Sequence, residues 1–506
     1  MKNIIIKNRL LAISKIAFFS LAILMGNACS DDDTKEVLPP DEPNVPDVPD
    51  VPDVPDVPDI PEVPSKAYFV KQEKAGSGSG EDWDNAMGTA ELRALLNSSA
   101  EATGDVENMT FHVAQGTYLI GDKPEGVTIA YKELEKQVVI KFWGGYDPAS
   151  TGTDLDKRDI VANPTTFTGD VNGNGEADDG DYSLFTLGAY TDVTFDGFTF
   201  SQGFHANNSD NSYGSGFYVA HAEATLQLNH CSIRKCRNHR IETEGAGGSA
   251  IFIDHGIVKL NDVLVRDNAT GDGGSLGTIR SKNNDVVLFI NGSRINFNVG
   301  REYGYAIQMS AGNLCMNNTF LIANWGSEGS INGAAAMLLV NNTIVEGCEG
   351  ILLRCESTPS QQSCLMNNII ITGGVVNYPL VNVSDPDKCR LTSKGYNLFG
   401  GIAPNNSGFI PSNTDLYGCT EWDSNGHKLG FNYNSEKEIS EWDENIAALG
   451  FTPTTLSAVK SAINEFDPDS RPAKIEQSLG KEFLGWLESI KAFPAEGNLI
   501  PGSYQK

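Results

Sequence analysis

The chain has 506 residues, of which 40% are hydrophobic and 20% are charged, so it can bury a large core and is not composed like a disordered protein. Its formal net charge of -29 would repel the phosphates of nucleic acids, which makes DNA and RNA poor candidate partners. The 52 glycines, and few long helical patterns, favour many short strands joined by tight turns. We therefore expect an all-β fold.

Residues 1–28 predict a bacterial lipoprotein signal peptide. Basic residues precede the apolar run 16–25, which is too short to span a bilayer comfortably. The motif Gly26-Asn27-Ala28-Cys29 resembles the lipobox of bacterial lipoproteins, which implies cleavage before Cys29 and a diacylglycerol on its thiol. The alternative is an ordinary secretory signal with an incidental cysteine. Ser30-Asp31-Asp32-Asp33 resembles the export signal of Bacteroidetes surface lipoproteins, which implies an outer-membrane lipoprotein facing the cell exterior; periplasmic display stays open.

Residues 29–65 are expected to form the lipidated cysteine and an acidic, proline-rich stalk. Val-Pro-Asp repeats run from Val45 to Asp59. Proline at every third position fixes φ and removes an amide donor, so polyproline II is the expected conformation. At about 3.1 Å per residue, residues 39–64 would extend roughly 80 Å from the lipid. A floppy spacer is the alternative, and neither form carries catalysis.

Residues 66–190 are expected to form an N-terminal cap and the first coils of a solenoid. Trp83-Asp84-Asn85-Ala86, a short helix over 91–97, His112-Val113-Ala114-Gln115-Gly116 and Phe142-Trp143-Gly144-Gly145-Tyr146 resemble the cap of pectin-lyase-like surface proteins. A cap is needed because the open end of a β-helix exposes unpaired strand edges and apolar core.

Residues 170–181 carry the sharpest local motif. Oxygen-bearing side chains follow the spacing of an EF-hand-type calcium loop, Gly175 allows the sharp turn, and Glu176 is placed to give its carbonyl. The loop resembles that of a dockerin, which implies calcium. Asp181 is shorter than the usual last ligand, and residues 182–200 resemble strand rather than helix, so a solvated turn is the alternative. The expected ligands are Asp170, Asn172, Asn174, Glu176, Asp178 and Asp181.

Residues 191–400 contain a repeat of the form apolar-x-apolar-Asn/Asp-x-x-apolar. Its Asn/Asp positions are Asp196, Asn229, Asn261, Asn291, Asn317, Asn341 and Asn367. Spacings of 24 to 33 residues fit one coil of a parallel β-helix with three strands per coil, whereas a helical repeat would need three- and four-residue apolar spacing. Gly-rich runs such as Gly245-Ala246-Gly247-Gly248 resemble repeats of polymorphic outer-membrane proteins. The resemblance implies a right-handed parallel β-helix.

The repeated asparagines are expected to be structural. Asparagine tolerates unusual φ values and can pair with backbone groups at a corner between strands. Stacked coils would align Asn229, Asn261, Asn291, Asn317, Asn341 and Asn367, so that each amide bonds to the next in a buried ladder.

A basic cluster interrupts this acidic chain at Arg234, Lys235, Arg237, His239 and Arg240. Polysaccharide lyases of this fold use Lys or Arg as the base beside a uronate carboxylate, so the resemblance makes the cluster a candidate ligand or lyase site. A solvated, basic corner is the alternative. No catalytic residue is assigned, and seven scattered histidines do not support a Ser/His/Asp triad.

The eight cysteines after Cys29 are expected in an oxidising compartment, where disulfides are allowed. No spacing resembles a zinc site, and we expect most of them to be buried apolar thiols, with their pairing left open. Residues 401–506 are expected to be an irregular C-terminal capping segment containing a helix over 481–492.

These patterns predict a surface-exposed lipoprotein whose β-helix binds glycan or another host or cell-surface ligand, in the manner of an adhesin. That inference rests on fold analogy, and fold alone does not set function. A polysaccharide lyase or hydrolase acting on an acidic glycan is the first alternative, and a structural surface antigen is the second. A groove lined by Lys, Arg and several acids would favour the enzyme, whereas exposed Tyr or Trp on a smooth surface would favour binding.

Overall fold

The computed structural model describes residues 65–499 with gaps, and all of these residues belong to one unit spanning residues 62–506. The gaps are 122, 153, 207–213, 240–246, 271–276, 300–304, 323, 325–328, 347–352, 356–360, 373–379, 388, 401–407, 418–453, 469–471, 473 and 495–497. The predicted signal peptide, Cys29 and the stalk up to residue 64 lie outside the described residues. Within the described part, no helix is both long and apolar enough to cross a membrane.

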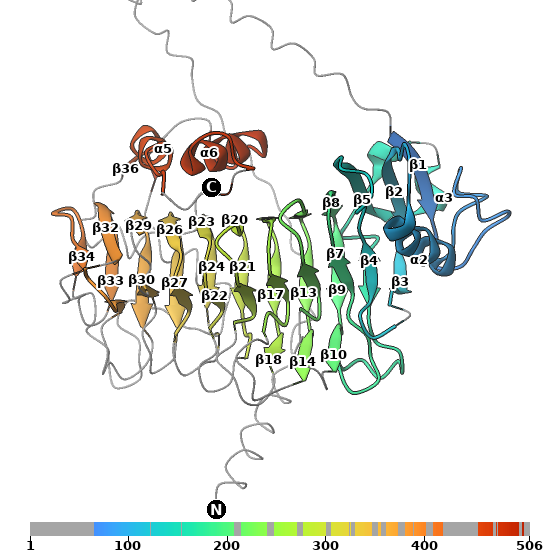
Figure 1. Cartoon of the computed structure of the whole chain (residues 1–506), viewed down its shortest axis with the longest axis horizontal. Helices are drawn as coiled ribbons and strands as arrows, with labels where there is room; N and C mark the ends of the chain where they lie inside the picture. The colour runs from blue at the N-terminus through green and yellow to red at the C-terminus, as the bar shows by residue number, and fades with distance from the viewer. Residues whose placement is uncertain are drawn as a thin grey trace, which may run out of the picture. The chain divides into compact units, whose positions relative to one another are not determined.

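Three long parallel sheets build the fold, and their strands succeed one another side by side (Figure 1). Sheet A contains β1 (Ser65–Val70), β2 (Asn108–Ala114), β5 (Val138–Tyr146), β8 (Thr191–Asp196), β12 (Thr225–Asn229), β16 (Ile257–Asn261), β20 (Val287–Asn291), β23 (Asn313–Asn317), β26 (Ala336–Val340), β29 (Gln361–Met366), β32 (Cys389–Gly395) and β34 (Phe409–Ile410).

Sheet B contains β3 (Gly116–Leu119), β6 (Thr165–Thr168), β9 (Phe198–Ser201), β13 (Ser232–Arg234), β17 (Leu264–Arg266), β21 (Arg294–Asn296), β24 (Phe320–Ile322), β27 (Thr343–Glu346), β30 (Ile369–Thr372), β33 (Leu398–Gly400) and β35 (Leu416–Tyr417). Sheet C contains β4 (Val127–Ile129), β7 (Phe185–Leu187), β11 (Phe217–Val219), β15 (Ile251–Ile253), β19 (Ile279–Ser281), β22 (Ile307–Met309), β25 (Ile331–Gly333), β28 (Leu353–Cys355) and β31 (Val381–Val383). A short parallel sheet of β10 (Phe204–Ala206), β14 (Arg237–His239) and β18 (Ala269–Thr270) lies between B and C along the chain.

From β3 to β33, the chain visits sheets A, B and C in turn, and each strand pairs in parallel with the equivalent strand of the next coil. This confirms the prediction of an all-β, right-handed parallel β-helix with three strands per coil. Side chains that alternate inward fill one continuous apolar core. In the first coils Phe111, Phe142 and Phe195 stack on one another at ring-centroid distances of 4.7 and 4.5 Å, because parallel pairing in register places like residues above each other.

Helix α2 (Thr89–Asn97) and the 3-10 turn η1 (Ser98–Glu101) lie at the N-terminal end of the coils. Leu92 and Leu96 of α2 are buried in the main core, which agrees with the helix expected over 91–97. Two short turns follow further along, α3 (Pro148–Thr151) and η2 (Leu155–Lys157).

The C-terminal helices cover the outer face of sheet A. Helix α5 (Leu456–Asn464) begins at Thr455, whose hydroxyl accepts from the Ala458 amide, and α6 (Leu479–Ser489) begins two residues before the expected helix. Figure 1 shows both helices beside this sheet, and the rings of Phe483 and Trp486 of α6 pack against Phe289 of β20 at centroid distances of 5.0 and 5.8 Å. A small antiparallel pair, β36 (Thr454–Thr455) and β37 (Asn498–Leu499), closes this segment.

The predicted asparagine ladder forms along the corner that follows sheet A, but from Asn261 onward. Asn229 is in register with Asn261, yet its side-chain oxygen accepts from Gln227 Nε2 instead. The side-chain Nδ2 atoms donate to the Oδ1 atoms of the preceding coil from Asn291 to Asn261, Asn317 to Asn291, Asn341 to Asn317 and Asn367 to Asn341, over 2.7 to 2.9 Å. The predicted alignment is wrong by one residue at one step: Asn317 is in register with Val340, not with Asn341. The amide bonds continue across this shift because Asn341 takes the left-handed corner position, at φ 56°, that Asn318 takes one coil earlier.

Two further ladders lie at corners that the sequence analysis did not single out. Asn342, Asn368 and Asn397 form one that ends on Asp415, and each side-chain oxygen accepts from the coil before it. The other runs through Asn268, Asn298 and Asn324. Buried polar groups are costly unless paired, so these ladders fix the coil register as well as the corner geometry.

Candidate functional site

The predicted calcium loop wraps around Asp170. Its carboxylate accepts from the backbone amides of Gly173 at 2.7 Å, Asn174 at 3.1 Å and Gly175 at 2.8 Å. These bonds turn the chain tightly around the first expected ligand, and the left-handed φ of Gly175, 80°, suits glycine at the sharp turn.

The remaining expected side-chain ligands converge on the same loop. The side-chain amides of Asn172 and Asn174 donate to the Asp178 carboxylate at 2.8 and 2.6 Å. The Asp181 carboxylate accepts from the backbone amides of Val171 and Asp178. Burial raises the pKa of Asp181, and the Asp178 and Asp170 carboxylates add to the rise. A bound cation would relieve this repulsion between carboxylates.

The donor set fits calcium by its chemistry. Asp170, Asn172, Asn174, Asp178 and Asp181, with the carbonyl of Glu176, offer hard oxygen ligands of the kind that calcium prefers. Across the described residues, no group of three or more His, Cys, Asp or Glu side chains is placed to hold a metal ion. Calcium binding therefore stays a prediction, and the ion would need amide and carbonyl oxygens as ligands as well as carboxylates.

Two corner side chains of sheet B hold this loop. Ser201 and Arg234 are register partners, so Gln202 and Lys235 follow them at equivalent corners, both with positive φ. Gln202 Nε2 and Lys235 Nζ donate to the Gly175 carbonyl over 3.3 and 2.9 Å. Lys235 also forms an ion pair with Glu176 at 3.4 Å.

The structure thus brings the predicted calcium loop and part of the basic cluster together. Arg234 is exposed at the end of β13 and lines a surface pocket with Asp170. Arg237 is exposed on β14, which belongs to the short sheet beyond the corner. The side chain of His239 and the whole of Arg240 lie outside the described residues.

The pocket beside the loop has a volume of about 390 Å³ and adjoins a second of about 450 Å³, with which it shares the lining residues Gln72, Thr117 and Leu119. We call the two together the sheet B groove. Besides these three residues, it is lined by Glu73, Lys74, Gly88, Thr89, Ala90, Glu91, Arg93, Thr166, Thr168, Asp170, Gly173, Ser201, Gln202 and Arg234.

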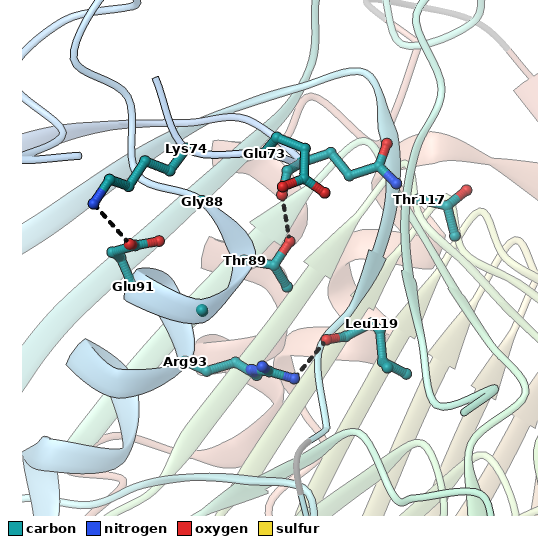
Figure 2. Close-up of a pocket in the computed structure, with 10 residues that line it drawn as sticks. Glu73, Lys74, Gly88, Thr89, Glu91, Arg93, Thr117 and Leu119 are labelled. Carbon is teal, nitrogen blue, oxygen red and sulfur yellow. Dashed lines mark hydrogen bonds and ion pairs between the residues drawn. The ribbon is translucent and has the colours of Figure 1, made fainter. Parts of the chain in front are cut away.

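The 450 Å³ part of the sheet B groove lies at the start of α2 (Figure 2). Lys74 pairs with Glu91 at 3.6 Å, and the Thr89 hydroxyl donates to the Gln72 carbonyl at 2.9 Å. Arg93 Nη1 donates to the carbonyl of Leu119 at 3.2 Å. These contacts hold polar and charged groups along the wall of the groove.

A row of hydroxyl side chains crosses the same face of sheet B. Thr117, Thr166, Thr199 and Ser232 are successive register partners on β3, β6, β9 and β13, and all four are at least partly exposed. With strands about 4.8 Å apart, the row repeats its hydroxyls along the direction in which the coils stack.

A second pocket, which the sequence analysis missed, lies over the outer face of sheet A. We call it the sheet A pocket; its volume is about 730 Å³. The ladder register continues from Asn229 back through Asp196, Trp143, His112 and Phe69 on the preceding strands. The pocket is lined by His112, Trp143, Tyr146, Leu155, Asp156, Arg158, Asp159, Ile160, Asp196 and His230.

Glycines allow the loop carrying Arg158 to sit on this surface. A Cβ on Gly197, whose φ is 79°, would lie 2.4 Å from Ile160 Cγ2, and one on Gly145, at φ 88°, would lie 2.8 Å from the same atom. The Asp159 amide donates to the Gly145 carbonyl at 2.9 Å. The loop is therefore docked closely enough for Arg158 to reach Asp196.

Asp196 is the charged centre of the sheet A pocket. It is 7% exposed, forms an ion pair with Arg158, and is bonded to His230 Nδ1 at 3.3 Å. The hydrogen bond to Asp196 raises the pKa of His230. Arg158 also lies over the Trp143 ring, with its Cζ 5.2 Å from the ring centroid.

His112 and Tyr146 form a second pair on the pocket wall, with the ring Nδ1 and the phenolic oxygen 3.1 Å apart. Burial lowers the pKa of His112 to about 4, and the Arg158 guanidinium adds to the effect. Burial raises the pKa of Tyr146. At neutral pH the pocket therefore presents an uncharged imidazole beside an intact phenol, with a guanidinium nearby.

Comparisons with protein-family models, with curated proteins and with solved structures find no match for this chain.

Proposed function

We propose that this protein is a Bacteroidetes surface lipoprotein, of the pectin-lyase-like kind, that is anchored in the outer membrane through Cys29 and binds an extended glycan in the sheet B groove. The observation that carries the proposal is the meeting of two signals far apart in sequence. Lys235 of the basic cluster contacts Gly175 and Glu176 of the expected calcium loop, and Arg234 and Asp170 line one pocket.

The polar groups of the groove suit a sugar polymer. Hydroxyls of Thr117 and Thr166 and the amides of Gln72 and Gln202 can exchange hydrogen bonds with sugar hydroxyls. Arg234 can pair with a carboxylate or sulfate on the chain, and calcium in the adjacent loop would add a second positive charge. The row of hydroxyls repeats from coil to coil, so one polymer could contact several coils at once.

The test begins with a glycan array probed with the full chain in calcium, followed by calorimetric titration of the strongest glycan. Arg234→Ala should weaken binding at least tenfold. The matched control is Arg390→Ala, because Arg390 is an exposed arginine on β32, distant along sheet A from the first coils. Equal affinity of both variants, or an array without any binding, would contradict the proposal; the latter would leave the structural surface antigen.

A second candidate, a polysaccharide lyase acting on an acidic glycan, is favoured by the sheet A pocket. Uncharged His112 could take a proton beside a uronate carboxylate, Tyr146 could supply one to the leaving oxygen, and Arg158 could stabilise the carboxylate's charge. Incubation with uronate polymers should then yield unsaturated products, detected by ultraviolet absorbance. Loss of these products in Tyr146→Phe, with Tyr131→Phe unaffected, would support the enzyme; no product from the unmodified protein would exclude it.

A further inference from the structure

Two buried thiols meet at the corner between sheets C and A. Cys355 ends β28, and Cys389 begins β32, which follows β31, the strand paired with β28. Their exposed fractions are 0% and 1%, and both side chains belong to the main apolar core. Both thiols are free in the structure, and the strands that carry them, β28 and β32, are in contact. Each thiol perturbs the pKa of the other, so that the pKa of Cys355 is raised and that of Cys389 is lowered.

The backbone holds this corner on both sides. Val383 is the register partner of Cys355, and the next residue, Ser384, donates to the Cys355 carbonyl from its amide at 2.9 Å and from its hydroxyl at 3.0 Å. The Cys389 amide donates to the Asp385 carbonyl at 2.8 Å. The turn that delivers Cys389 is therefore attached to Cys355, so the proximity of the thiols follows from the coil geometry.

Other described cysteines are placed differently. Cys231 and Cys236 donate to backbone carbonyls of Asn229 and Arg234. Cys315 and Cys364 occupy one row of sheet A but are separated by Leu338 of the intervening strand. Two strand spacings, roughly 9.6 Å, exceed the Cα separation that a disulfide spans.

We propose that Cys355 and Cys389 form a disulfide in the exported protein. Each thiol loses its proton and one electron as the Sγ–Sγ bond forms, and the two electrons reduce the disulfide of a thiol-oxidising protein in the cell envelope. The bond would join β28 of sheet C to β32 of sheet A, which follows β31, the strand paired with β28. Because coils contact mainly their neighbours, a covalent link late in the solenoid would oppose fraying from the C-terminal end.

The experiment uses full-length protein recovered from the cell envelope without reductant, unfolded in acid, and alkylated in denaturant before peptide mapping by mass spectrometry. The expected result is a linked peptide pair containing Cys355 and Cys389, two hydrogens lighter than the separate peptides, while Cys231, Cys236 and Cys315 are alkylated. Full alkylation of both cysteines, or linkage of either one to a different cysteine, would overturn the proposal.

Melting curves supply a second readout. Reductant should lower the melting temperature of the unmodified protein by several degrees. It should leave the Cys355→Ala/Cys389→Ala variant unchanged, and that variant should melt near the reduced protein. The Cys315→Ala variant, which keeps the proposed pair, should respond to reductant like the unmodified protein; an equal response of the double variant would also overturn the proposal.

Discussion

Replacing Asn317 with leucine tests the ladder at a buried position that is bonded to the coils on both sides. Asn317 is 1% exposed, donates to Asn291 at 2.8 Å and accepts from Asn341 at 2.7 Å. Leucine has similar bulk but neither donor nor acceptor. The change therefore removes two hydrogen bonds and leaves one acceptor, on Asn291, and one donor, on Asn341, without these partners.

The magnitude follows from those two groups. A buried polar group that loses its partner costs about 1–3 kcal/mol, so the pair costs roughly 2–6 kcal/mol. Burial of the leucine side chain returns up to about 2 kcal/mol. With about 2 kcal/mol subtracted, we expect the free energy of unfolding to fall by up to about 4 kcal/mol, with a central value of about 2 kcal/mol, and the damage to reach both neighbouring coils.

Urea and thermal unfolding, followed by far-ultraviolet circular dichroism, measure this loss. The control is Lys282→Leu, because Lys282 is exposed and its ion pair with Asp254 at 3.3 Å is of the surface kind, worth about 0–1 kcal/mol. Asn317→Leu should be the less stable variant, and glycan binding per folded molecule should be retained. Unchanged melting together with lost binding would refute the structural role of Asn317.

Three other outcomes are expected. Cys29→Ala should abolish incorporation of labelled fatty acid in cells, because it removes the expected acyl acceptor; labelling equal to the unmodified protein would refute the lipoprotein prediction. Millimolar calcium, compared with a chelator, should raise the melting temperature of the unmodified protein and of the control Asp179→Asn, an exposed loop residue outside the ligand set, but not of Asp170→Ala. The folded pKa of His112 lies below its unfolded value of about 6.5, so its contribution to stability is present above pH 6.5 and lost as the pH falls to about 4. This loss should be on the order of 2 kcal/mol after solvent screening, and His112→Gln should show a shallower dependence in urea unfolding across that range.

The repeat could be predicted from the sequence because it depends on local chemistry. Apolar alternation and a corner asparagine recur in each coil, and both have a physical reason that does not need distant residues. The error at Asn341 has an equally local cause. Asn317-Asn318 and Asn341-Asn342 look identical in sequence, but β26 ends at Val340, so the first asparagine of the second pair already occupies the corner.

The two pockets could be predicted only in part. The calcium loop and Arg234 each carry a local signal, but their contact through Lys235 spans 60 residues and depends on the register of β9 and β13. One feature of the sequence pointed to the sheet A pocket: position 196 carries an aspartate where later repeats carry asparagine. Arg158 comes from a loop outside the repeat, so no period could place it there.

Asp196 and the asparagines from Asn261 to Asn317 occupy the same register position, but they are stabilised in different ways. Where the row carries neutral amides, from Asn261 to Asn317, each residue satisfies the next and the row needs no outside partner. A carboxylate at 7% exposure cannot be stabilised in that way, because an unpaired buried charge is far more costly than a buried amide. Asp196 therefore depends on Arg158, and Arg158 depends on a loop that fits only over Gly197. An asparagine at position 196 would have kept a neutral amide in this row without any of these partners. The aspartate and the residues that support it therefore favour a chemical role for the charged cluster.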